Sequence, residues 1–168
     1  VVWARAFGVA DRATGAQATP ETMFQAASIS KPVAATAALA LVEQGKLGLD
    51  RPVNEQLTSW QVPAHAFGEA VTLRRLLSHT AGLTVHGFPG YRSDAPLPTL
   101  VQVLNGAPPA NTAAVRVDLQ PGSRWRYSGG GITVAQLLMS DTTGEPFPAL
   151  AERLVLRPLG LSRSTFAQ

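Results

Sequence analysis

FQAASISKPV, the stretch from Phe24 to Val33, leads directly into an apolar, alanine-rich run that continues to Val42. The run predicts a helix that begins at Ser28 or Ser30 and ends near Gly45, because glycine is the residue type that most often terminates helices. Nearly every face of this helix is apolar, which is typical of a helix buried in the centre of a domain. We therefore expect the fold to be organised around it.

The start of this helix carries a serine and a lysine at a spacing suited to nucleophilic catalysis. Ser28 and Lys31 are three residues apart, so on a helix their Cβ atoms lie about 5–6 Å apart on one face. A serine hydroxyl becomes a good nucleophile when a base removes its proton, and a lysine held away from water can have its pKa lowered towards that task. Backbone N–H groups at the helix start also favour a developing oxyanion.

Taken alone, this spacing is more often a helix cap than an active site. Ser28 or Ser30 would then cap the helix, and Lys31 would be a solvated residue of its first turn. Two features favour catalysis instead. A lysine in the first turn is at the unfavourable end of the helix dipole, and Pro32 fixes the geometry of that turn. Both interpretations stay open at this point.

A second unusual stretch is RYSGGG, in which Tyr127 precedes three glycines and a helix predicted from Ile132. The small residues leave the phenol of Tyr127 accessible and allow a substrate or the backbone to approach closely. The alternatives are a loop tyrosine that packs over a helix start and, less favoured, a phosphate-binding loop. No lysine follows the glycines, as a phosphate-binding loop requires.

Composition excludes several classes of function. The 168 residues are 45% hydrophobic and 15% charged, which is typical of one globular domain. The net charge of +3 comes without a dense basic stripe, so nucleic-acid binding is not expected. There is no cysteine, and the three histidines lack metal-ligand spacing, so we expect no metal and no other cofactor. The apolar run is too short to span a membrane.

The remaining pattern predicts short helices, irregular segments and very few strands. A single strand is predicted over residues 1–10, and SRSTFAQ at residues 162–168 resembles the start of another. A lone strand is unstable without partners, so its partners are expected from outside this chain. The other expected elements are a helix from Thr72 to about Gly82, an irregular loop from Val85 to Pro98, a helix capped by Thr99, and a last helix closed by Pro158 and Gly160.

Several motifs together resemble one known family. They are FGVADRATG, FQAAS with Ser28-x-x-Lys31, LRRLLSHTAGL, Tyr127-Ser128-Gly129 and LRPLGLSRSTF. In this order they resemble the serine β-lactamase and DD-peptidase superfamily, in the branch of class C β-lactamases and related carboxylesterases. The resemblance covers nearly the whole chain. It implies an α+β fold of the β-lactamase/transpeptidase type and favours the catalytic interpretation of the serine–lysine pair.

The resemblance also implies a role for each residue of the motifs. Ser28 would be the acylated nucleophile, and its backbone N–H would form half of an oxyanion hole. Lys31 would help to deprotonate Ser28. Tyr127 matches the first position of the family's Tyr-x-Asn motif, whose phenol passes protons to the leaving group and later activates water. His79 lies in a family signature but matches no catalytic position, so we interpret it as structural.

Two departures from the family pattern limit these expectations. Gly129 stands where the family has the asparagine of Tyr-x-Asn, so this tentative substrate-binding position lacks a side-chain amide. The family's Lys/His-Thr/Gly-Gly strand, which supplies the second oxyanion donor, does not occur after Tyr127. We therefore expect residues 1–168 to form a single partial domain that is inactive or nearly so alone. The C-terminal part would be supplied by the same protein or by a separate chain.

The predicted function is that of a serine hydrolase that works through an acyl-enzyme. Small carboxylic esters are the preferred substrates, with β-lactams or D-amino-acid peptides as the next choices. The alternative is a non-catalytic binding or scaffold protein related to penicillin-binding proteins, although Lys31 and Tyr127 would not be expected to persist in it. The family implies a periplasmic or secreted bacterial protein, but no signal peptide is present in this segment, so the compartment stays open.

Overall fold

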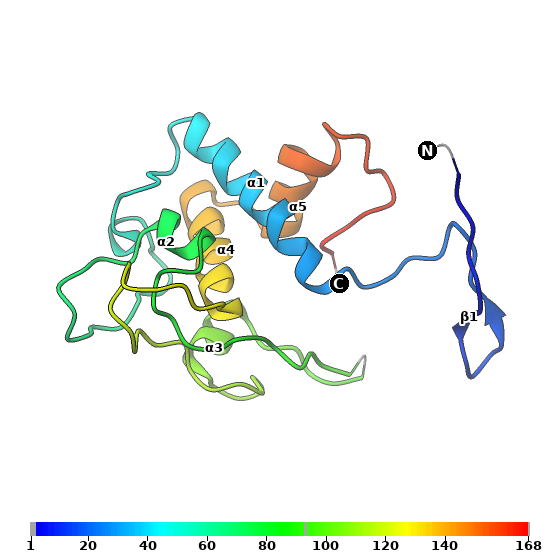
Figure 1. Ribbon diagram of the computed structural model, residues 1–168, viewed down its shortest axis with the longest axis horizontal. Coiled ribbons are helices and arrows are strands. Elements are labelled where there is room, and N and C mark those ends of the chain that lie inside the picture. Colours follow the sequence, from blue (N-terminus) through cyan, green and yellow to red (C-terminus); the bar gives the residue numbers. More distant parts are fainter. Residues whose placement is uncertain (1–2, 93, 168) are drawn as a thin grey trace.

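A computed structural model describes residues 3–92 and 94–167. The chain forms a helical body and a small β-hairpin that stands apart from it, joined by an extended segment (Figure 1). In the body, α1 (Ser30–Glu43) packs against α4 (Gly129–Thr143) and against α5 (Phe147–Ala151). The fold class is therefore α+β, as the sequence predicted. No helix among the described residues is long and apolar enough to cross a membrane.

Helix α1 is confirmed, but its burial on every face is not. Its buried side chains form one stripe, at Ala34, Ala37, Ala38 and Leu41, which is the spacing of a single helix face. On the opposite face Leu39 is 48% exposed. The alanine-rich sequence does not reveal which face is buried, because alanine is common both in protein cores and on protein surfaces. The helix ends as predicted at a left-handed glycine, Gly45, with φ of 70°.

Helix α4 is the helix that is buried nearly all round. It begins at Gly129, three residues before the predicted start, and nine of its residues are buried. Its cap is Ser128, whose hydroxyl accepts the N–H of Gly131 at 2.9 Å. The glycines belong to the first turn because neighbouring segments lie very close there. A Cβ at Gly130 would stand only 2.8 Å from the Val115 side chain and 2.9 Å from the Thr84 carbonyl oxygen.

The shorter helices follow their capping signals with one exception. Thr99 and Gln102 form a reciprocal capping box at α3 (Leu100–Asn105), as the threonine predicted. Helix α2 (Leu73–Leu77) is capped by Thr72 as predicted but ends at Ser78, not near Gly82. It ends early because His79 adopts a left-handed backbone with φ of 57°. The remaining elements are η1 (Ala27–Ile29), η2 (Val53–Glu55) and η3 (Glu152–Leu156), a π-helical turn that extends α5 to just before Pro158.

The strand predictions were largely wrong. The first strand, β1, covers Val9–Asp11 and pairs antiparallel with β2 (Ala16–Gln17), so its partner lies in this chain. Residues 3–8 form no strand, and residues 1 and 2 lie outside the described part. At the other end residues 162–167 form no strand, and residue 168 lies outside the described part. The alternation that suggested a longer strand reflects exposed aromatic residues, since Trp3 and Phe7 are 71% and 73% exposed.

Candidate active site

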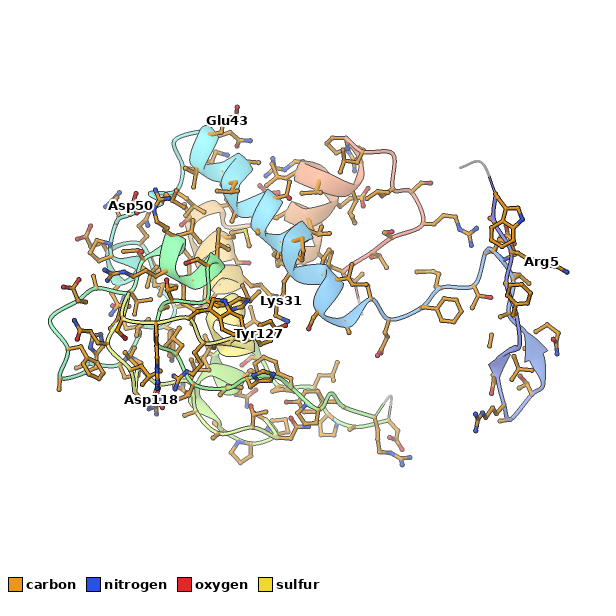
Figure 2. The ribbon with its side chains drawn as sticks, in the orientation of Figure 1. Arg5, Lys31, Glu43, Asp50, Asp118 and Tyr127 are labelled. Atoms are coloured by element: carbon orange, nitrogen blue, oxygen red, sulfur yellow. The ribbon has the colours of Figure 1, made fainter. Side chains whose placement is uncertain are left out.

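The side chains of Ser28, Lys31 and Tyr127 meet at the start of α1. Lys31 Nζ donates a hydrogen bond to Ser28 Oγ at 2.9 Å, and the Tyr127 hydroxyl donates to the same oxygen at 2.8 Å. Figure 2 shows Lys31 and Tyr127 next to each other where α1 and α4 begin. Ser28 itself is exposed, in the η1 turn that precedes α1. The three residues that the sequence singled out therefore form one cluster.

The backbone before Ser28 is strained. Ala27 has a φ of 45°, in the left-handed region that residues with a Cβ rarely adopt. Such conformations cost of order 1–3 kcal/mol and concentrate at functional sites. This residue turns the chain from the extended segment into η1, which directs Ser28 Oγ towards Lys31 and Tyr127.

The electrostatics of the cluster lower the pKa of the Tyr127 phenol. Hydrogen bonding with Lys31 and then with Ser28 lowers the pKa of Tyr127 below its usual value, and desolvation opposes this. The charge of Lys31 acts in the same direction, with Nζ lying 4.9 Å from the centroid of the tyrosine ring. A phenol with a lowered pKa gives up its proton more readily, so Tyr127 is suited to proton transfer at Ser28.

His79 holds the backbone on both sides of Tyr127. Its carbonyl oxygen accepts the N–H of Arg126 at 2.8 Å, and its Nδ1 accepts the N–H of Ser128 at 3.2 Å. Its ring also packs on the tyrosine ring, with centroids 4.5 Å apart. Burial, then the charge of Lys31 and then His86 lower the pKa of His79. The lowered pKa favours the neutral imidazole, which carries its proton on Nε2 when Nδ1 accepts a hydrogen bond.

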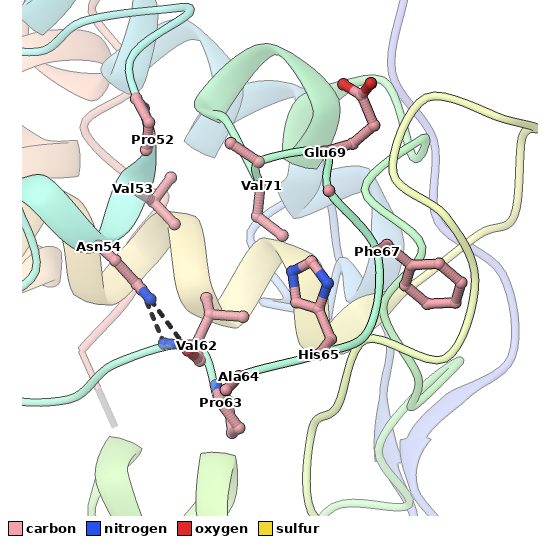
Figure 3. A pocket seen from close by; sticks show the side chains of 12 residues that line it. Pro52, Val53, Asn54, Val62, Pro63, Ala64, His65, Phe67, Glu69 and Val71 are labelled. Carbon is pink, nitrogen blue, oxygen red and sulfur yellow. Dashed lines mark hydrogen bonds between the residues drawn. The ribbon is translucent and has the colours of Figure 1, made fainter.

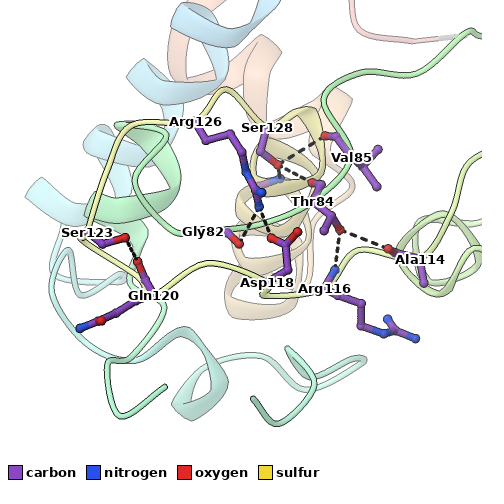
Figure 4. A network of polar contacts seen from close by, with 11 residues as sticks. Gly82, Thr84, Val85, Ala114, Arg116, Asp118, Gln120, Ser123, Arg126 and Ser128 are labelled. Atoms are coloured by element: carbon purple, nitrogen blue, oxygen red, sulfur yellow. Dashed lines mark hydrogen bonds and ion pairs between the residues drawn. The ribbon is translucent and has the colours of Figure 1, made fainter. Parts of the chain in front are cut away.

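A polar network anchors the residues next to Tyr127. Figure 4 shows Ser128 Oγ donating to the Thr84 carbonyl oxygen, at 2.7 Å. The Arg126 guanidinium donates to the Gly82 carbonyl oxygen at 2.9 Å and pairs with Asp118. Tyr127 thus lies between two residues that are each fixed to the segment after α2, which keeps its hydroxyl in place over Ser28.

Gly129 lies beside the cluster but offers no side chain to it. It is buried in the first turn of α4, and its N–H donates to the His86 carbonyl oxygen at 3.0 Å. The His86 ring lies against Tyr127 from a second direction, with centroids 4.9 Å apart. Sequence reasoning did not predict contacts from His79 or His86 to the phenol, because both depend on how the loop after α2 folds back onto α4.

A cavity of about 950 Å³ opens at this cluster, and all four predicted site residues line it. Much of the lining is aromatic or aliphatic. The loop predicted to be irregular, from Val85 to Pro98, contributes His86, Phe88, Tyr91 and Leu97. The other apolar walls come from Leu100, Val103, Trp125, Ile132, Phe147 and Phe166. These last residues were missed, because no local sequence signal relates them to Ser28.

A second, smaller cavity of about 300 Å³ lies between residues 52–54 and residues 62–71 (Figure 3). It shares no lining residue with the cavity at Ser28. His65 lines it, and Asn54 bridges its two sides through hydrogen bonds with the backbone of Val62. Within residues 3–92 and 94–167, no group of three or more His, Cys, Asp or Glu side chains is arranged to hold a metal ion.

Comparison with known proteins agrees with this geometry. The family model described as Beta-lactamase matches residues 1–168. Esterase EstB of Burkholderia gladioli is 33% identical over 177 residues, covering 96% of this chain and 43% of EstB. The putative penicillin-binding protein PbpX of Bacillus subtilis is 30% identical over 167 residues, covering 99% of this chain and 38% of PbpX.

Among solved structures, EstCE1, described as a hydrolase with promiscuous acyltransferase activity, superposes with a TM-score of 0.76 at 36% identity. That match covers 95% of this chain and 44% of EstCE1. The chain therefore spans about two fifths of the length of the relatives it matches.

Proposed function

Because this chain belongs to the beta-lactamase family, we propose that Ser28 is the nucleophile of a serine hydrolase that works through an acyl-enzyme. The observation that carries the proposal is the pair of hydrogen bonds at Ser28 Oγ, from Lys31 at 2.9 Å and from Tyr127 at 2.8 Å. A nucleophile within hydrogen-bond reach of its base is the expected arrangement for this chemistry.

In the first half of the reaction, Ser28 Oγ attacks the carbonyl carbon of the substrate. The C–O bond to the enzyme forms as Lys31, acting as an amine, takes the hydroxyl proton. The carbonyl π electrons move to the oxygen, and the Ser28 backbone N–H stabilises that oxyanion. The intermediate then collapses, and the leaving alkoxide departs with a proton from the Tyr127 hydroxyl. Lys31 keeps the serine proton, so the acyl-enzyme holds Tyr127 as phenolate beside the Lys31 ammonium group.

In the second half, water attacks the acyl carbon of Ser28. Tyr127 as phenolate takes a proton from the water and passes it to Ser28 Oγ as the carboxylic acid is released. The proton held by Lys31 then returns to the phenolate, which restores the starting state. The lowered pKa of Tyr127 supports this step, because it increases the fraction of phenolate near neutral pH. The hydrogen bonds that His79 accepts and the contacts of Arg126 and Ser128 keep the phenol in place in both halves.

Small carboxylic esters are the proposed substrates. The apolar lining of the cavity and the absence of a side-chain amide at Gly129 support this choice. So do the names of EstB, an esterase, and EstCE1, a hydrolase. β-Lactams and D-amino-acid peptides are the second choice, supported by the penicillin-binding-protein relatives. The intact Lys31–Ser28–Tyr127 contacts count against a non-catalytic scaffold protein.

We also propose that residues 1–168 are part of one domain and have little activity alone. The chain spans about two fifths of its relatives, and an oxyanion hole needs a second donor besides Ser28. The loss of one such donor typically lowers the rate about 10²- to 10³-fold. Purified residues 1–168 that hydrolyse an activated ester as fast as the full-length protein would overturn this part of the proposal.

The nucleophile is tested by covalent labelling of the full-length protein. A fluorophosphonate should add its mass once, and peptide mapping should place the adduct on Ser28. Ser28→Ala should remove the adduct. Ser162→Ala, at an exposed serine far along the chain, should keep it. An unlabelled Ser28 in a folded protein would refute the proposal.

A further inference from the structure

Residues 86–88 occupy the space that a side chain at position 129 would need. A Cβ built on Gly129 would stand 3.1 Å from the His86 carbonyl oxygen, 3.2 Å from Cε2 of the Phe88 ring and 3.4 Å from Gly87 Cα. The hydrogen bond from the Gly129 N–H to His86, at 3.0 Å, holds the two segments together. The glycine therefore leaves no open space beside it, because the Phe88 ring lies there.

Phe88 presents this ring to the cavity that contains Ser28. The side chain lines the cavity and remains 38% exposed. Leu97, on the same loop, also lines the cavity and is 56% exposed. Exposed apolar side chains inside a concave site gain stability when a ligand covers them, at about 25 cal/mol per Å² of buried apolar surface. The wall next to Gly129 is thus suited to an apolar group.

The scarcity of charged side chains along the cavity also favours a neutral substrate group. Among the described residues that line it, Lys31 is the only lysine, arginine, aspartate or glutamate, and its Nζ already donates to Ser28 Oγ. These residues offer no second cation for a substrate carboxylate. A neutral group therefore fits this wall better than an anionic one, because burying an unpaired carboxylate carries a large desolvation cost.

We propose that Phe88, seated against Gly129, forms the binding wall for the acyl group, and that the preferred substrates are esters of neutral aliphatic or aryl carboxylic acids larger than acetate. This inference rests on the proposed function and specifies its substrate. The acyl part is the relevant one because it alone stays bonded to Ser28 through both halves of the reaction. Each further methylene buried against the wall should raise kcat/KM about fourfold until the wall is filled.

The experiment compares p-nitrophenyl acetate, butyrate, hexanoate and phenylacetate on the full-length protein. The wild type should favour the larger acyl groups in kcat/KM. Phe88→Ala should lower kcat/KM at least about tenfold for hexanoate and phenylacetate but less than about threefold for acetate, because only large groups reach the ring. Phe67→Ala, at a phenylalanine of the other cavity, should leave the profile unchanged.

Each result decides the matter. An unchanged acyl profile in Phe88→Ala, an equal loss for all four esters, or a wild type that prefers acetate would overturn the inference. If Ser28 is labelled and esters are hydrolysed, such a result leaves the proposed function standing. A wild type that hydrolyses no ester and leaves Ser28 unlabelled would overturn both the inference about Phe88 and the proposed function. Should Phe88→Ala not fold, Phe88→Leu serves instead, and it should keep hexanoate turnover while losing preference for phenylacetate.

Discussion

The Tyr127 hydroxyl lies 2.8 Å from Ser28 Oγ, although 99 residues separate the two in the chain. Ser28 precedes α1 and Tyr127 precedes α4, so the packing of these two helices sets the distance between the hydroxyls. Lys31 completes the contact from the first turn of α1. The site therefore exists only when α1 and α4 are packed correctly, and its chemistry can be tested one side chain at a time.

Removal of the Tyr127 hydroxyl should impair proton transfer while the ring keeps its packing in the site. Tyr127→Phe retains the ring that packs on His79 but loses the hydroxyl. General acid–base groups typically contribute 10²- to 10⁴-fold, so kcat of the full-length protein should fall by about that factor while KM changes little. Steady-state kinetics with one activated ester measure this. A change of less than about threefold in kcat would show that the hydroxyl takes no part in the chemistry.

The pH dependence should follow the lowered pKa of Tyr127. Because the phenolate is the base of the second half-reaction, kcat should rise with pH through a pKa below the usual value of about 10 where deacylation limits turnover. Lys31→Met should move the rising part of the pH–rate profile to higher pH, because Lys31 is the first cause of the lowered pKa of Tyr127. An NMR titration of ¹³Cζ-labelled tyrosine, assigned with Tyr127→Phe, reports the same ionisation directly.

The lowered pKa of Tyr127 also determines the direction in which the free energy of unfolding changes with pH. Between the folded pKa of Tyr127 and the unfolded value near 10, the folded protein is the more ionised and binds fewer protons. The free energy of unfolding contributed by Tyr127 therefore increases with pH across that window and is lost as pH falls through the folded pKa. A contribution of opposite sign, compared between the wild type and Tyr127→Phe by urea unfolding, would contradict the assignment.

His79 should act as a positioning residue through its Nδ1 contact. His79→Asn places an amide oxygen near the position of Nδ1, and asparagine tolerates the left-handed backbone that His79 adopts. His79→Ala loses the acceptor. We expect kcat to fall about tenfold or more in His79→Ala with KM nearly unchanged, and to recover substantially in His79→Asn. Equal loss in both variants would instead assign the effect to the imidazole ring.

The glycines at the start of α4 offer a matched pair of stability tests. Gly130→Ala would bring a methyl group to 2.8 Å from Val115 and 2.9 Å from the Thr84 carbonyl oxygen, whereas Gly131→Ala has its nearest neighbour at 3.5 Å. Overpacking of this kind costs about 1–3 kcal/mol. Gly131→Ala should be neutral or stabilising by up to about 1 kcal/mol, because alanine favours the helix. Chemical denaturation of both variants measures the difference.

Gly129→Asn addresses the family difference directly. Because residues 86–88 fill the space next to Gly129, an asparagine there should displace that loop rather than form an amide-binding site. The variant should melt at a lower temperature than the wild type and should show no gain in hydrolysis of a chromogenic cephalosporin. A clear gain would mean that the loop yields easily and that the glycine alone limits β-lactam turnover.

The sequence predicted the parts of the site that depend on local spacing. Ser28 and Lys31 are one helical turn apart, so their contact follows from helix geometry alone. Tyr127 was connected to them only through the family resemblance, because a contact between residues so far apart leaves no local pattern. Helix α3 was predicted for the same local reason, since Thr99 caps it, whereas α4 begins three residues before its predicted start.

The errors share a physical cause as well. The role of His79 depends on its left-handed backbone, which shortens α2 and turns the imidazole towards Ser128. The burial of α1 was overestimated because alanine is compatible with both core and surface. The hairpin was missed because β2 has only two residues. In each case the outcome depends on neighbours that a short stretch of sequence does not specify.

The central claim is that Ser28 becomes acylated during turnover. Mass spectrometry of the full-length protein, quenched within the first turnovers of p-nitrophenyl butyrate, tests this most directly, and the Tyr127→Phe variant should accumulate the species if deacylation slows. We predict a mass increase of one butyryl group, mapped to the peptide that contains Ser28 and absent from Ser28→Ala. Ester hydrolysis that proceeds without any acyl adduct, or that persists in Ser28→Ala, would contradict the account.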